Sequence, residues 1–101
     1  MLFNQVCIQL EKDFHLCGLD FDSISTTEIE SFVKSIVSFL EDIMRHEPEK
    51  LRALLYRIDI EENLITSLFE KSASMENLFL SLSKAIILRE IIKIQSRSKY
   101  N

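Results

Sequence analysis

The fold expected for this chain is decided by residues 75–97, MENLFLSLSKAIILREIIKIQSR. The segment contains no glycine or proline, and its apolar residues recur every three or four positions, which predicts one long helix over residues 75–97. One apolar stripe runs through Met75, Leu78, Phe79, Leu82 and Ile86. A second stripe, rotated by well over a quarter turn, comprises Leu80, Ile87, Ile91 and Ile94. Because a helix that is apolar on two sides must be covered on two sides, we expect its first half to be central and its second half to contact a partner subunit.

Two helices are expected in the first half of the chain. Residues 2–17 carry an amphipathic helical pattern, and Gly18, the single glycine, stands where a left-handed C-cap is favoured. A second helix has the cleanest amphipathic pattern of the chain and ends before Pro48, which disfavours helical geometry in the preceding residue. Its start is marked by two capping-box patterns, Ser25-x-x-Glu28 and Thr27-x-x-Glu30.

Two short helices are expected between Pro48 and the long segment. Pro48 suits the first turn of the third helix. Its apolar side comprises Leu51, Leu54, Leu55 and Ile58. Asp59, with Glu62 three residues later, fits another capping box and predicts a fourth helix near residues 60–71. Ser74 stands where the N-cap of the last helix is expected.

The composition favours a single all-helical domain. The chain has 101 residues, of which 47% are hydrophobic and 28% charged, so it can form one core. One glycine and one proline cannot supply the tight turns of a sandwich or barrel. The fold class predicted is therefore all-α, with residues 1–101 forming one compact orthogonal bundle of about five helices around the long C-terminal helix.

Charge and cysteine content narrow the classes of partner and compartment. The net charge of −4 is unlike that of an electrostatic nucleic-acid binder, so nucleic acid is not the expected partner. Cys7 and Cys17 suggest no disulfide framework, as in a reducing compartment. The longest uninterrupted apolar run, residues 85–88, is too short to cross a bilayer, and no secretory signal pattern is present. We therefore expect a cytoplasmic protein with no membrane association.

A basic ridge is formed by Arg89, Lys93 and Arg97, which recur every four residues of the last helix. These cations complement the dipole at the helix C-terminus, and they also suit an acidic protein, RNA or a membrane surface. Residues 1–50 contain 4 basic and 10 acidic side chains, whereas residues 51–101 contain 8 and 6. A second copy of the chain would therefore offer this ridge an acidic surface.

No residue pattern typical of catalysis, cofactor binding or metal binding is found. Cys7, His15 and Cys17 lack ligand spacing, and Asp42 with His46 is a weak pair on one helical face. One glycine cannot form a phosphate-binding loop or a nucleophile elbow. A helix-turn-helix centred on residues 58–59 would present carboxylates to DNA, which repels them. We expect a protein that is not an enzyme and has no cofactor.

Two short stretches carry a resemblance. Residues 54–60, LLYRIDI, and residues 87–93, ILREIIK, resemble pieces of small all-helical bacterial proteins with no assigned function. The resemblance implies a bacterial origin and a helical fold, and it supplies no functional residue. Within the first stretch we expect Asp59 to cap a helix and Arg57 to be solvated.

The function expected is a non-enzymatic protein-interaction module that acts as a homodimer. Its interface would comprise Leu80, Ile87, Ile91 and Ile94. A regulatory nucleic-acid binder that uses the basic ridge is the first alternative. The second is a small metal-binding protein or enzyme built on His15, His46 and neighbouring carboxylates.

Overall fold

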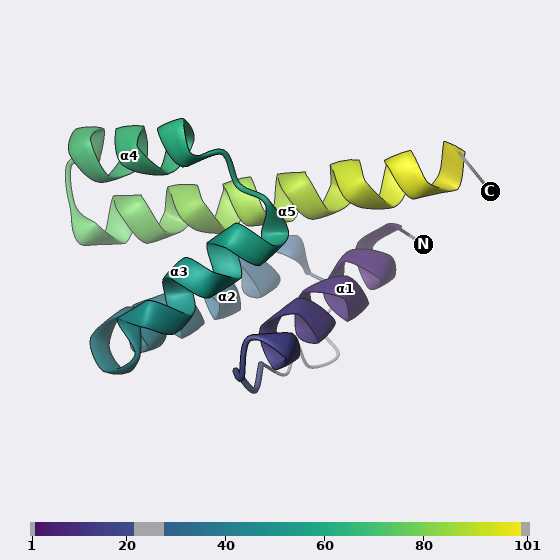
Figure 1. Cartoon of the computed structure of the whole chain (residues 1–101), viewed down its shortest axis with the longest axis horizontal. Helices are drawn as coiled ribbons and strands as arrows, with labels where there is room; N and C mark the ends of the chain where they lie inside the picture. The colour runs from purple at the N-terminus through teal and green to yellow at the C-terminus, as the bar shows by residue number, and fades with distance from the viewer. Residues whose placement is uncertain (1, 22–27, 100–101) are drawn as a thin grey trace.

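The structure is a computed structural model that describes the backbone of residues 2–21 and 28–99 and the side chains of residues 4–21 and 28–97. Within these residues the chain forms five helices and no strand. They are α1 (Leu2–Leu16), α2 (Ile29–His46), α3 (Pro48–Ile58), α4 (Glu62–Lys71) and α5 (Met75–Lys99). Figure 1 shows α5 spanning the length of the molecule, and α5 contacts each of the other four helices. The predicted all-α bundle around a central C-terminal helix is confirmed.

The end of α1 follows the prediction for Gly18. This residue has a φ of 77°, in the left-handed region. Its N–H donates to His15 O at 3.0 Å, and the Leu19 N–H donates to Phe14 O at 2.9 Å. The two bonds form a Schellman motif, which satisfies the last carbonyl groups of the helix. Lys50 Nζ donates to Gly18 O at 3.0 Å and ties this turn to α3.

Replacing Gly18 by alanine should lower the free energy of unfolding by about 1 kcal/mol, because an L side chain is strained in the left-handed region. The added Cβ would lie 3.4 Å from Lys50 Nζ, at the end of a flexible side chain, so steric overlap adds little. Gly18→Asn should lose less, since asparagine tolerates this conformation better. Urea denaturation measures both variants, and equal stability of Gly18→Ala and wild type would refute the assignment of the cap.

The ends of the later helices confirm one predicted cap and correct another. The Asn77 N–H donates to Ser74 Oγ at 3.1 Å, so Ser74 caps α5 as predicted. Asp59 is wrong as the N-cap of the fourth helix, because it ends α3 in the left-handed conformation with a φ of 69°. Glu61 precedes α4 instead. The patterns that begin at Ser25 and Thr27 lie outside the described residues.

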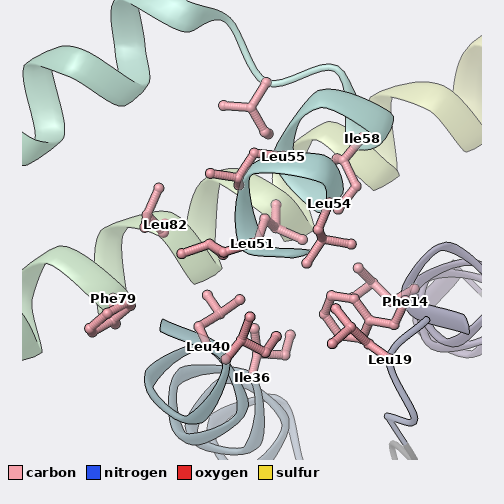
Figure 2. Close-up of a cluster of buried hydrophobic side chains, with 14 of the residues drawn as sticks. Phe14, Leu19, Ile36, Leu40, Leu51, Leu54, Leu55, Ile58, Phe79 and Leu82 are labelled. Atoms are coloured by element: carbon pink, nitrogen blue, oxygen red, sulfur yellow. The ribbon is translucent and has the colours of Figure 1, made fainter. Parts of the chain in front are cut away.

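The core lies between α1, α2, α3 and α5 (Figure 2). Each of these helices contributes its apolar side, and α4 adds the half-buried Ile65 and Leu68. Phe14 is fully buried among aromatic rings, with ring centroids 4.8 Å from Phe21 and 5.3 Å from Phe39. The helix α2 packs on α5, and its broad apolar side contributes the buried residues Phe32, Ile36, Leu40 and Ile43 to the core.

Candidate functional site

Two sides of α5 have unusual composition, because one buries a carboxyl group and the other exposes aliphatic side chains. One side is buried against α1 and contains Glu90, a carboxyl group in the protein interior. The other side is open to solvent between Leu80 and Gln95. Figure 1 shows α4 lying along the first half of α5, while the second half extends beyond α4.

Glu90 and Asp13 form a buried carboxyl pair between α5 and α1. Glu90 is 0% exposed and Asp13 is 3% exposed. Both carboxyl oxygens of Glu90, and Oδ2 of Asp13, are buried without a hydrogen-bond partner among the described residues. Burying a charged oxygen without a donor is costly, so this pair is the chemically unusual feature of the core.

The partners of Asp13 come from α1 and α3. Arg57 Nε donates to Asp13 Oδ1 at 3.2 Å, and Gln9 Nε2 donates to the same oxygen at 3.2 Å. Arg57 is therefore not simply solvated, as the sequence led us to expect, but forms an ion pair that joins α3 to α1.

The partners of Glu90 are cations of its own helix. Lys93 Nζ lies 3.7 Å from Glu90 Oε1, and it donates to Arg57 O at 3.3 Å. Arg97 Nη2 donates to Gln9 Oε1 at 3.1 Å, one layer further along α1. The carboxyl pair is thus surrounded by positive charge from two helices.

The pKa of Glu90 is shifted by its burial and by the charged groups around it. Burial and, after it, the repulsion by the nearby Asp13 carboxylate raise the pKa of Glu90 from 4.5 to about 7, while Lys93 and Arg97 oppose the rise. Burial likewise raises the pKa of the Cys17 thiol above its usual value, with Arg57 lowering it and Asp13 raising it further. Glu90 therefore exchanges its proton close to neutral pH.

The predicted basic ridge is engaged within the chain. Arg89 Nη2 donates to Asp59 Oδ2 at 2.9 Å, which joins α5 to the turn after α3. Lys93 lies beside Glu90, and Arg97 contributes its charge near the same carboxyl group. The spacing of Arg89, Lys93 and Arg97 correctly predicted that they share one face of the helix. It did not predict that their partners come from α1, from α5 itself and from the end of α3.

The exposed side of α5 is a narrow apolar ridge. From residue 80 to residue 95, the residues that the structure describes as exposed are Leu80, Lys84, Leu88, Ile92 and Gln95. We call this set the α5 ridge. Leu88 is 58% exposed and Ile92 is 43% exposed, and Lys84 is the one charged member. Single exposed aliphatics are ordinary, but a row of them four residues apart is typical of a contact surface.

Of the four predicted interface residues, one is exposed and three are half-buried. Leu80 is exposed and belongs to the α5 ridge. Ile87, Ile91 and Ile94 are half-buried and pack against the core of the same chain. The structure adds Leu88 and Ile92, which the sequence analysis did not select because they lie between its two apolar stripes.

The other candidate residues lie apart from one another. His15 Nδ1 is 3.9 Å from Asp20 Oδ1, and His46 Nδ1 is 3.0 Å from Asp42 O, both at the surface. Among the described residues no group of three or more His, Cys, Asp or Glu side chains is placed to hold a metal ion. Cys7 and Cys17 are not joined in a disulfide. No helix in the described part of the chain is long and apolar enough to cross a membrane.

A shallow, open depression of about 640 Å³ lies between the end of α2 and the start of α5. It is lined by Glu41, Met44, Arg45, Met75, Glu76 and Phe79. The polar residues of this lining, Glu41, Arg45 and Glu76, are not buried, whereas a ligand site has polar groups placed inside a concave pocket.

Comparisons with protein-family models, with curated proteins and with solved structures find no match for this chain.

Proposed function

We propose that this protein is a small, non-enzymatic interaction module that acts as a homodimer and uses the α5 ridge as its contact surface. The observation that supports the proposal is the composition of the ridge, in which three of the five exposed residues are aliphatic and one is charged. Depletion of charge together with exposed apolar side chains is typical of the centre of a protein interface. Ile91, which is half-buried beside the ridge, would add its remaining surface.

The spacing of the ridge suits a second copy of the same helix. Leu80, Lys84, Leu88 and Ile92 are four residues apart, and rows of this kind interdigitate in the commonest class of helix packing. An antiparallel pair related by a two-fold axis would place Leu88 of both copies near the axis. Lys84 of one copy would then lie near Ile92 of the other, which keeps the two lysines apart.

Charge favours a protein partner over a nucleic acid. Arg89, Lys93 and Arg97 have partners within the chain, so a phosphate backbone would have to compete for them. The α5 ridge itself contributes one lysine, and the chain has a net charge of −4. A second copy that covers aliphatic side chains needs no change in these ion pairs.

Replacing Leu88 by lysine should dissociate the homodimer, because two ammonium groups would meet at the centre of the contact. Sedimentation equilibrium at micromolar concentration should give twice the mass of the chain for wild type and the mass of one chain for Leu88→Lys. The thermal midpoint of the monomeric variant, measured at low concentration, should match that of wild type, since Leu88 is exposed.

The matched control is Ile8→Lys, which places the same charge on α1 at a residue that is 67% exposed. This variant should remain dimeric. A monomeric wild type would overturn the proposal. A dimer that survives Leu88→Lys would remove the α5 ridge as its contact surface.

A further inference from the structure

Asp13 and Glu90 bring two acidic groups together where α1 packs on α5. Three of their four carboxyl oxygens are buried and lack a hydrogen-bond partner among the described residues. If both groups were ionised, two like charges would lie close together away from water. One proton bound to the pair removes that repulsion, and the resulting O–H donates to the other carboxylate, which supplies the missing hydrogen bond.

We propose that the Asp13–Glu90 pair is a proton-dependent latch, which holds α1 against α5 while one proton is bound and loosens α1 when that proton is lost. The latch lies on the buried side of α5 and the α5 ridge on the exposed side, so the proposal does not depend on the homodimer.

The cations around the pair can stabilise the single negative charge that remains when one proton is bound to the two carboxyl groups. From α3, Arg57 contacts Asp13, and from α5, Lys93 lies beside Glu90 with Arg97 one turn further on. On α1 the Cys17 thiol interacts electrostatically with Asp13 and with Arg57. Arg89 is paired with Asp59 at the turn before α4. The buried residues of α2 are all apolar, namely Phe32, Ile36, Leu40 and Ile43.

The direction of the pH effect follows from where the proton binds more tightly. In the closed bundle the pKa of Glu90 is about 7, whereas its ordinary value is 4.5. Between these values the closed state holds more protons than the open state, so opening becomes easier as pH rises. The stabilisation by the proton is complete below pH 4.5 and is lost as pH rises through about 7. The equilibrium for opening should therefore rise about tenfold between about pH 6 and pH 8, and level off at higher pH.

Amide hydrogen exchange of the full chain, corrected for the intrinsic rate at each pH, tests the latch. In wild type, the protection of α1 should fall about tenfold between about pH 6 and pH 8 and then change little. Glu90→Gln, which has the same shape and no proton to lose, should keep α1 protection constant within about twofold. Glu70→Gln, at an exposed residue of α4, should behave like wild type.

The outcomes separate the latch from a merely buried pair. Protection of α1 that is independent of pH in wild type would overturn the proposal, and so would an equal fall in wild type and in Glu90→Gln. An equal fall in all helices would also contradict it, because the bundle would then open as a unit. Should Glu90→Gln fail to fold, the wild-type profile alone still decides, since a fall confined to α1 that levels off above about pH 8 is required.

Discussion

Replacing Phe14 by alanine should lower the free energy of unfolding by about 3–5 kcal/mol, which is the usual cost of removing a buried aromatic side chain. Phe14 is 0% exposed and contacts both Phe21 and Phe39. The cavity left behind would lie beside the rings of Phe21 and Phe39. Since a domain of this size has a total stability of about 5–15 kcal/mol, the thermal midpoint should fall by more than about 12 °C.

The control for this variant is Phe69→Ala on α4, where the ring is exposed. It removes the same atoms from a surface position and should cost less than about 1 kcal/mol. Differential scanning calorimetry measures both variants. Similar losses for Phe14→Ala and Phe69→Ala would contradict the placement of the core between α1, α2, α3 and α5.

Replacing Arg57 by methionine should cost about 2–4 kcal/mol, because it leaves the Asp13 carboxylate buried without its ion-pair partner. Asp13 is almost fully buried, whereas Arg57 is partly exposed, so the loss should lie below that of a fully buried pair. Methionine retains the apolar stem and separates the effect of charge from that of packing. Chemical denaturation at neutral pH measures the change.

A double-mutant cycle with Asp13→Asn identifies the cause. In the Asp13→Asn background the charge is gone, so Arg57→Met should cost less than about 1 kcal/mol. If Arg57→Met costs the same in both backgrounds, the ion pair is not what joins α3 to α1.

The helices were predictable because their signals are local. The proline that follows α2 placed the end of this helix close to its observed last residue, His46, whereas the two capping-box patterns for its start begin outside the described residues. Gly18 and Ser74 marked helix ends through the backbone conformation and the hydrogen bond that these residues favour. Asp59 was assigned wrongly because aspartate suits both an N-cap and the left-handed end of a helix, and the observed φ of 69° shows the second.

The carboxyl pair was not predicted, although its sequence contained a signal. Glu90 lies four residues from Ile86, three from Ile87 and four from Ile94, so its carboxyl group falls within an apolar surface. Asp13 has a similar setting after Leu10 and before Cys17. Periodicity shows that each acid is flanked by apolar residues, but the pairing of two distant acids depends on how α1 is rotated against α5, which is a property of the packed bundle.

The rotation of α1 against α5 also decides which residues of α5 are left exposed. The sequence showed that α5 has more apolar surface than one side can bury. It did not show that Ile87, Ile91 and Ile94 would pack against the core of the same chain while Leu88 and Ile92 stay exposed. That the second half of α5 has a partner stays a prediction, and the contact surface that we propose lies further around the helix.

Intermolecular nuclear Overhauser effects, measured in a sample that mixes isotope-labelled and unlabelled protein, test self-association through the α5 ridge most directly. The account predicts cross-peaks between the methyl groups of Leu88 in one copy and those of Leu88 and Ile92 in the other. Cross-peaks confined to a different surface, such as that around Ile8, would contradict it, as would the absence of any intermolecular cross-peak at a concentration suited to the measurement.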